Sequence, residues 1–252
     1  MRHTVGALAA CGLVLGMAAT AFAQSGAPAR GFIGVNGGYQ PTSGDFNDNI
    51  ERTRFDETER ISITHGVDSG ALIDFSAGYF VMERVSVGIG VHRMSSSSTA
   101  AVGGSVPHPI FFSRPRSFAV AADGLDRTEL GVHLSVGYSL PVMDKLDVRI
   151  FAGPTAFRLT QDVVGEVTVS EAGAPFSSVN AAATGVERKR TAWGGHIGAD
   201  ISYLFVEGDA ASMGAGLFLR YAGASTDVDL INRAVSTDVG GFQVGAGLRV
   251  RF

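Results

Sequence analysis

The chain has 252 residues, of which 45% are apolar, 17% are charged and 34 are glycine. With 20 basic against 24 acidic side chains, the formal net charge is −4, which argues against a nucleic-acid-binding protein. Beyond the N-terminal segment, no apolar run approaches the roughly 18 residues of a membrane-spanning helix, so a helical membrane protein is excluded.

The first 23 residues are expected to form a secretory signal peptide. Arg2 and His3 precede an apolar stretch from Val5 to Ala19, and Ala21 and Ala23 are small residues at the positions that signal peptidase reads. The pattern therefore predicts export and cleavage after the second of these alanines.

A second interpretation of the N-terminus is a lipoprotein cleavage box, Leu8-Ala9-Ala10-Cys11, in which Cys11 would carry the lipid. The apolar run continues well past Cys11, which favours cleavage after Ala23. The mature chain, residues 24–252, then has no cysteine, because Cys11 is the single one. Disulfides, zinc–thiolate sites and cysteine nucleophiles are excluded together.

The mature chain contains segments in which apolar residues alternate with polar or small ones. A strand with one face toward lipid and the other toward a polar interior shows this period of two. Eight segments show it, in chain order: Gly31–Gln40, Ala71–Val81, Val85–His92, Glu129–Tyr138, Leu146 to about Leu159, Thr191–Phe205, Ser212–Tyr221 and Gly241–Phe252.

The connections between these segments are alternately short and long. The long ones are polar or rich in Ser, Ala and Gly, and they are Pro41–Gly70, Met94–Arg127, Thr160–Arg190 and Ala222–Asp238. Within the second of them, Met94–Ser105 indicates a mobile loop. Short turns such as Pro141–Lys145 on one side and long loops on the other are typical of a transmembrane β-barrel.

Two of the long connections contain further alternation, at Arg60–Thr64 and Val163–Ser170. Either neighbouring strands extend above the membrane, or an extra hairpin makes a ten-stranded barrel. We favour eight strands, because these segments are short and charged and lack a periplasmic partner turn. The prediction is an all-β, transmembrane, antiparallel up-and-down barrel formed by residues 24–252.

The barrel prediction is supported by the aromatic residues and by the C-terminus. Aromatic side chains fall at the ends of strands, where interfacial girdles are expected: Tyr79, Tyr138, Tyr203 and Phe205 at the short-turn ends, and Trp193 at a long-loop end. The last strand alternates to the final residue, with lipid-facing positions Val244, Ala246, Leu248, Val250 and Phe252.

With these features the chain resembles the small outer-membrane β-barrel proteins of Gram-negative-type bacteria, the group of OmpA, OmpX and OmpW types and the opacity-like adhesins. The stretches "YQP" at Tyr39–Pro41 and "FAGPTAFRL" at Phe151–Leu159 are similar to ones common in that group. The resemblance implies residence in the outer membrane, contact with its lipid and lipopolysaccharide, and a final strand ending in Phe252 that the barrel-assembly machinery reads. Members include adhesins, envelope stabilisers, conduits and lipid-modifying enzymes, so the fold alone does not assign the role.

Charged residues are expected on the inward faces of the strands. They are Asp74, Glu129, Asp147 and Asp200 against Arg149, Arg220, Arg249 and Arg251, together with His92, His133 and His196. An eight-stranded barrel is just wide enough for side chains to fill it, and an unpaired buried charge is costly. We therefore expect a network of opposite charges and no general pore, with a proton or solute path as the alternative.

Catalysis and metal binding are not expected. His133 and Ser135 form an H-x-S pair similar to that of an outer-membrane lipid deacylase, but the alternation points both into the lumen. The histidines of the mature chain show no pair at ligand spacing, and no cofactor is indicated: His65, His92, His108, His133 and His196.

The predicted role is structural or a surface interaction carried by the long loops. The basic run Glu187–Arg190 would lie near lipopolysaccharide phosphates or simply be solvated. The rival function is a conduit for small hydrophobic molecules, with Phe111, Phe112 and Phe118 lining a pocket at the loop end. The rival fold is a soluble lipocalin-type barrel, which requires the apolar faces to point inward.

Overall fold

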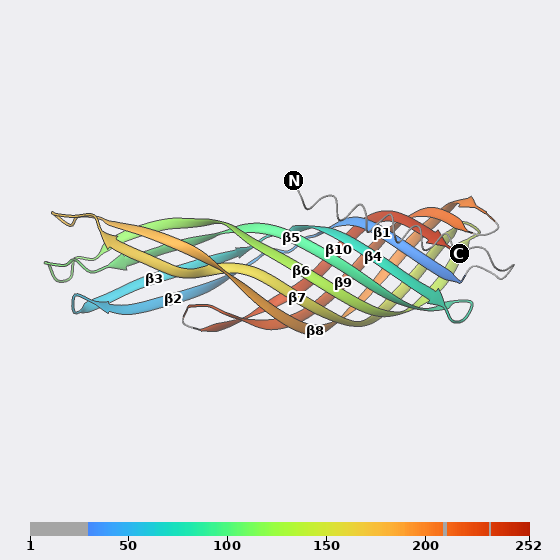
Figure 1. The fold of residues 1–252 in the computed structure, drawn as a ribbon, viewed down its shortest axis with the longest axis horizontal. Coiled ribbons are helices and arrows are strands. Elements are labelled where there is room, and N and C mark those ends of the chain that lie inside the picture. The colour runs from blue at the N-terminus through green and yellow to red at the C-terminus, as the bar shows by residue number, and fades with distance from the viewer. Residues whose placement is uncertain (1–29, 209–210, 232) are drawn as a thin grey trace.

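The computed structural model describes residues 30–208, 211–231 and 233–252, and the predicted signal peptide, residues 1–23, lies outside them. No helix long and apolar enough to cross a membrane occurs in this described part of the chain. Ten antiparallel strands are present (Figure 1): β1 Gly31–Gln40, β2 Gly44–Arg54, β3 Glu57–Val67, β4 Gly70–Phe80, β5 Val85–Val106, β6 Arg116–Met143, β7 Leu146–Glu171, β8 Val179–Glu207, β9 Ser212–Asp229 and β10 Ala234–Arg251.

Eight of the ten strands close into a ring. The order is β5-β4-β1-β10-β9-β8-β7-β6, and β6 pairs back to β5 to complete it. The first and last strands meet at a seam, where Gly31 and Phe252 exchange backbone hydrogen bonds of 2.6 and 2.9 Å. The predicted antiparallel β-barrel is confirmed, with eight strands in the closed ring and ten in the sheet.

The two additional strands, β2 and β3, form a hairpin above the ring. β4 pairs with β5 through residues 86–95, and β3 takes over as the neighbour of β5 at residues 100–105. The hairpin thus continues the wall of the barrel beyond the end of β4. The alternation at Arg60–Thr64 belongs to this extra hairpin, whereas that at Val163–Ser170 is an extension of β7.

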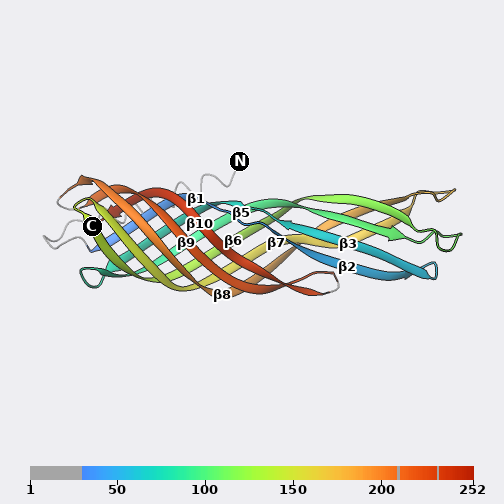
Figure 2. The same cartoon turned by 180° about the vertical axis from the view of Figure 1, so that it is seen from behind.

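Most of the predicted long loops are strands, and this corrects the sequence interpretation. Met94–Ser105 lies within β5 instead of forming a mobile loop, and the run Glu187–Arg190 lies within β8 instead of at a loop junction. The turn expected at Pro141–Lys145 shrinks to the two residues between β6 and β7. Figures 1 and 2 show β2, β3 and β5 to β8 continuing to one end of an elongated molecule, far from the C-terminus.

The ring and the strands beyond it have opposite polarity. In the ring, large apolar side chains such as Ile73, Leu134 and Leu217 are exposed on the outside, and polar side chains are buried within. The apolar band ends at a row in which Leu130 lies between Arg93 and Arg158 on the neighbouring strands. Both arginines are exposed, which places the edge of the hydrocarbon layer at this row.

Beyond that row the interior is apolar, and we call this part of the barrel the extension. Its core consists of buried residues from β2, β3, β5, β6 and β7: Ile50, Ile61, Ile63, Ala100, Val102, Ala122, Leu125, Val164 and Val167. Here the outer surface meets water, so burial of apolar area must occur inside, as in a soluble protein. From the segment that suggested a loop, Ala100 and Val102 face inward into this core.

A charged cap closes the far end of the extension. Arg54 contacts Glu59 and Glu171, each at 3.5 Å, and Arg116 pairs with Glu171. Hydrogen bonding from Arg116 lowers the pKa of the Glu171 carboxyl from its ordinary value. These ion pairs join the β2–β3 hairpin to β6 and β7, so the extension is fastened at its tip.

A histidine side chain, His65, is buried in the extension without a hydrogen-bond partner in the described part of the chain. His65 stacks on Phe46, with ring centroids 4.7 Å apart, and neither ring nitrogen has a hydrogen-bond partner among the described residues. Burial lowers the pKa of His65 below its ordinary value of 6.5, although the charge of Asp48 opposes the shift. A neutral, unpaired imidazole in an apolar core costs stability.

We expect His65→Leu to stabilise the extension by about 1–3 kcal/mol, because it removes this unsatisfied group. Since the folded pKa lies below 6.5, the stability that depends on neutral His65 is present above pH 6.5 and is lost as the pH falls through the lowered pKa. Proteolysis of the β2–β3 hairpin should accelerate on acidification in the parent chain and much less in the variant. Identical acceleration in both chains would contradict this account.

Candidate functional site

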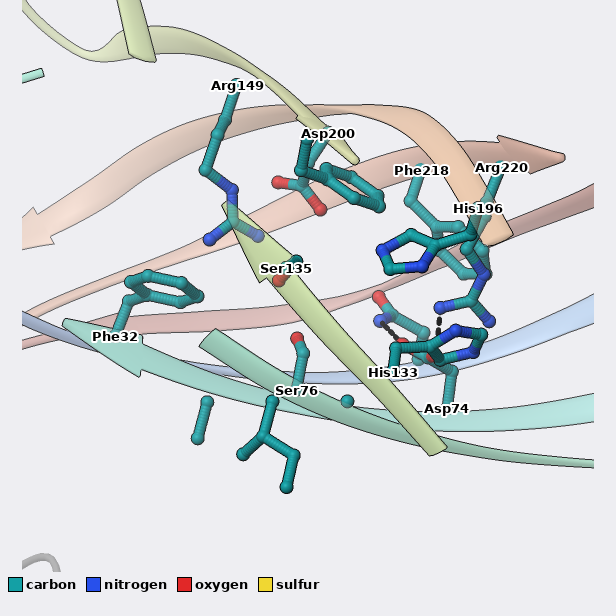
Figure 3. A pocket seen from close by; sticks show the side chains of 15 residues that line it. Phe32, Asp74, Ser76, His133, Ser135, Arg149, His196, Asp200, Phe218 and Arg220 are labelled. Carbon is teal, nitrogen blue, oxygen red and sulfur yellow. Dashed lines mark hydrogen bonds and ion pairs between the residues drawn. The ribbon is translucent and has the colours of Figure 1, made fainter. Parts of the chain in front are cut away.

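The inward faces of the ring strands build a polar column inside the membrane-spanning part of the barrel. Figure 3 shows part of it, with Asp74, His133, His196 and Arg220 pointing toward one another from different strands. All eight predicted charged residues face this lumen: Asp74, Glu129, Asp147, Arg149, Asp200, Arg220, Arg249 and Arg251.

At the top of the lumen, Glu129 is fully buried and neutralised by Arg127, whose Nη2 lies 2.6 Å from the carboxylate. Glu129 also accepts hydrogen bonds from Gln40 at 3.1 Å and from the backbone N–H of Gly240 at 2.9 Å. Gly240 has a φ of +89°, and a Cβ there would lie 2.2 Å from the carbonyl oxygen of Ala222. Glycine is therefore required where the backbone of β10 turns its N–H toward the carboxylate.

In the middle of the lumen, Arg220 donates a hydrogen bond of 2.9 Å to Asp74, which also accepts one of 2.9 Å from Asn36. The Nε of Arg220 donates to Gln243 at 2.7 Å. Gln243 in turn donates to Gln40 at 2.7 Å. The upper and middle layers are thus one connected hydrogen-bond network.

Three histidines meet beside this layer. His92 Nδ1 and His133 Nε2 are 2.7 Å apart, and Thr155 bridges His133 and His196 at 2.8 and 2.9 Å. Gly131, opposite His92, makes room for the ring, since a Cβ there would lie 2.2 Å from its Cε1. These three histidines meet although the sequence shows no pair of them at ligand spacing, because spacing along the chain does not show which positions share a level of the barrel.

The other two histidines among the described residues, His65 and His108, lie in the extension and its tip loop. In the described ranges, no group of three or more His, Cys, Asp or Glu side chains has the arrangement to hold a metal ion. The three lumenal imidazoles are used in hydrogen bonds to one another and to Thr155.

Near the short-turn end, Arg249 forms a bidentate contact with Asp200, with Nε at 3.1 Å and Nη2 at 2.5 Å, and donates to Asn36 at 2.6 Å. Arg251 pairs with Asp147. The acidic and basic positions predicted for these strands therefore meet inside the lumen, where β10 contributes the arginines and β8 and β7 contribute the aspartates.

Arg149 departs from the prediction of opposite-charge pairs. It forms no ion pair within the described residues, and its guanidinium lies 4.0 Å from the centroid of the Phe32 ring. A cation over an aromatic face is a partial substitute for a carboxylate in a desolvated site. The Phe32 side chain points into the lumen. The sequence analysis assigned no role to this residue.

The column leaves little free space. The cavity among these side chains has a volume of about 30 Å³ and is lined by Asp74, His133, Arg149, Asp200 and Arg220. Such a cavity holds one or two water molecules but no larger solute. Ion pairs across a narrow lumen of this kind brace the barrel wall.

His133 and Ser135, the candidate catalytic pair, both face this lumen (Figure 3). His133 is engaged with His92 and Thr155, and Ser135 donates to the Gly88 carbonyl at 3.4 Å. Neither side chain reaches the lipid face, so the geometry gives no support to lipid hydrolysis at this pair.

The outward-facing candidates lie where lipid is expected. Exposed aromatic side chains occur at both edges of the apolar band: Tyr79, Tyr138, Trp193, Tyr203 and Phe205. On β10, Val244, Ala246 and Leu248 are exposed, whereas Val250 and Phe252 are half-buried at the seam with β1.

Two further groups of residues singled out in the sequence lie in the extension. In the run Glu187–Arg190, Lys189 pairs with Glu187 at 2.6 Å, and Arg190 pairs with Asp229 of β9. Phe118 packs against the core of the extension, but Phe111 and Phe112 are exposed. These phenylalanines therefore do not jointly line a pocket.

Several lumenal residues were missed by sequence reasoning: Asn36, Gln40, Arg127, Thr155, Gln161 and Gln243. Most of them fall on the inward phase of their strands, so the alternation contained the signal. They were overlooked because neutral amides and hydroxyls are not conspicuous as charge partners, and Arg127 lay in an expected loop.

We expect Arg249→Met to destabilise the barrel by about 3–5 kcal/mol, because it leaves Asp200 buried without its cation. Adding Asp200→Asn should recover much of the loss, giving a clear coupling energy. Lys189→Met, which removes an exposed partner of Glu187, should cost less than about 1 kcal/mol. Urea unfolding followed by the fluorescence of Trp193, the single tryptophan, measures these changes. Additive effects of the two lumenal substitutions would contradict the pairing.

Comparisons with known proteins agree with this architecture. The sequence model of the family described as "Outer membrane protein beta-barrel domain" matches residues 9–249. No curated protein matches the chain.

Three solved structures show the level of similarity. Neisserial surface protein A, NspA, is 13% identical, with a TM-score of 0.45, and the match covers 90% of this chain and 98% of that one. OprG from Pseudomonas aeruginosa is 11% identical, with a TM-score of 0.41, and the match covers 89% of this chain and 96% of that one. Ail from Yersinia pestis is 9% identical, with a TM-score of 0.36, and the match covers 87% of this chain and 99% of that one. Because the family model covers nearly the whole chain, this protein belongs to the outer-membrane protein β-barrel domain family and resides in the bacterial outer membrane.

Proposed function

We propose that the protein is a closed membrane anchor whose extension makes contacts at the cell surface, without catalytic activity and without a solute path. The observation that carries the proposal is the contrast between the two halves. The lumen holds a cavity of only about 30 Å³ among paired charges. The extension is a separate ordered structure with its own core and cap.

The lengths of the strands support a role for the extension. A transmembrane strand needs about 9–11 residues, whereas β6 has 28 and β8 has 29. The excess is in the apolar-cored part beyond the membrane. Anchoring alone requires none of it, so the extension is where a function beyond residence in the membrane is to be sought.

The rival function, a conduit for small hydrophobic molecules, has less support. A conduit needs an apolar entry site above the lumen and an exit from it. The upper end of the lumen is instead filled by Phe157, Leu159, Val163 and other buried residues, and the Arg127–Glu129 ion pair lies at the level of Gln161 and Leu159. Of the phenylalanines expected to line the entry, Phe111 and Phe112 are exposed and Phe118 packs against the core of the extension.

Two partners are part of the proposal. The outside of the ring contacts outer-membrane lipid and lipopolysaccharide, which surround every barrel of this membrane. The final strand, with Phe252 at the seam, is proposed as the signal read by the barrel-assembly machinery during insertion.

The test compares two aspartate substitutions on neighbouring residues of β3. Ile63 is buried in the core of the extension, and Ser62 is exposed on the opposite face. Ile63→Asp places a charge in the core and should disrupt the extension, whereas Ser62→Asp adds the same charge outside. Attachment of expressing bacteria to epithelial monolayers should fall to the empty-vector level only for Ile63→Asp.

The parent protein, purified and inserted in a planar bilayer, should show no conductance steps, because the lumen is filled. Each variant must retain the mobility shift of a folded barrel on heating. Stable conductance by the parent chain, or attachment that is unaffected by Ile63→Asp, would contradict the proposed function.

A further inference from the structure

The extension carries a small group of exposed apolar residues at its tip. In the described part of the extension, every large apolar side chain that is exposed belongs to the β2–β3 turn or the β5–β6 loop: Phe55, Ile110, Phe111 and Phe112. The other exposed large apolar residues lie on the lipid-facing ring and its short turns. We call these four residues the apolar tip, which lies at the end of the molecule farthest from the C-terminus (Figure 1).

The loop that bears three of these residues is held in place. His108 Nδ1 accepts the backbone N–H groups of Ile110 and Phe111 at 3.1 and 3.2 Å. The backbone N–H of Ser113 donates to Glu57 at 2.8 Å, and Arg116 donates to the Pro107 carbonyl at 2.6 Å. The loop is therefore tied to the β2–β3 turn and to the charged cap, and its apolar side chains are presented outward.

The backbone at the tip is strained in the β2–β3 turn. Phe55 and Asp56 occupy the centre of the β2–β3 turn with φ values of 53° and 60°. Such a two-residue turn favours Asn-Gly, and a bulky residue at positive φ is an outlier. Phe55 is nonetheless exposed there, with the guanidinium of Arg54 5.3 Å from its ring centroid. Strain of this kind, kept in order to display an aromatic ring, points to a contact made by that ring.

The chemistry of the tip favours a lipid surface over a protein groove as its partner. Three of the apolar residues are consecutive in the β5–β6 loop, and Arg114 beside them makes a cation–π contact of 5.6 Å with Phe111. Arg114 has no carboxylate partner within the described residues. Aromatic and aliphatic side chains flanked by a free cation suit a bilayer interface, with the rings among acyl chains and the guanidinium at phosphates.

We propose that the apolar tip inserts into a phospholipid bilayer other than the one that holds the barrel, such as the membrane of a neighbouring cell. This proposal rests on the surface role proposed above and names its partner. The barrel fixes one end of the chain in its own membrane, and the extension holds Ile110, Phe111 and Phe112 away from it.

The test uses the full-length barrel in nanodiscs, so that the lipid-facing ring is already covered. Binding to added vesicles of phosphatidylcholine and phosphatidylglycerol is measured by flotation. The parent protein should float with the vesicles, and Phe111→Ser/Phe112→Ser should weaken binding at least about tenfold. Arg114→Gln should weaken binding to these anionic vesicles but leave binding to pure phosphatidylcholine unchanged.

The matched control is Val142→Ser/Met143→Ser at a short turn, at the opposite end of the barrel. Val142 and Met143 are 54% and 70% exposed, against 53% and 72% for Phe111 and Phe112, so two apolar residues of matching fractional exposure are replaced. The control should bind vesicles like the parent chain. Equal binding by the Phe111→Ser/Phe112→Ser protein, or no vesicle binding by the parent, would overturn the proposal.

Failure here is distinguishable from failure of the proposed function. If bacteria attach to monolayers in an Ile63→Asp-sensitive manner but the protein ignores vesicles, the surface role stands and the lipid partner is wrong. A protein partner would then be indicated. If attachment does not depend on the extension at all, the proposed function itself fails.

Discussion

The constraint on which the structure depends is the change of solvent along the length of each strand. Near the short turns the outside of the barrel is lipid, so the outward phase of the alternation is apolar and the inward phase is polar. Above the row of Arg93, Leu130 and Arg158 the outside is water. The same strands continue, but the inward phase becomes apolar, and the residues of the extension core meet.

The two halves of the barrel are consequently stabilised by different interactions. Within the membrane, buried charge has to be neutralised, and Asp74, Glu129 and Asp200 each have an arginine within 3 Å. That neutralisation fills the lumen. Above the membrane, the apolar interior needs no such pairing, and the Arg116–Glu171 pair instead closes the outer end. A wall that is braced by charge below and by apolar packing above can hold a tip loop rigidly at a distance from the bilayer.

The ring could be predicted from the sequence and the extension could not, for a physical reason. Alternation with large apolar residues such as Leu130, Val132 and Leu134 identifies lipid-facing strands, and it indicates the inward phase on which Asp74 and Arg249 lie. In part of the extension, as in Ser95 to Ala101, the residues are small or polar, and this composition also suits a loop. Which side chains contact one another could not be predicted either. The register between neighbouring strands brings His92, His133 and His196 together, although they have no regular spacing along the chain.

The central claim is that the polarity of the two faces inverts along one strand. It can be tested directly on β6 with single spin labels at introduced cysteines, because residues 24–252 contain no cysteine of their own. Leu134→Cys should be accessible to oxygen, as lipid-facing sites are, and Ala121→Cys, exposed in the extension, to a water-soluble nickel reagent. Ala122→Cys, in the extension core, should be accessible to neither. Oxygen accessibility at residue 121 equal to that at residue 134, or free access of nickel to residue 122, would contradict the account.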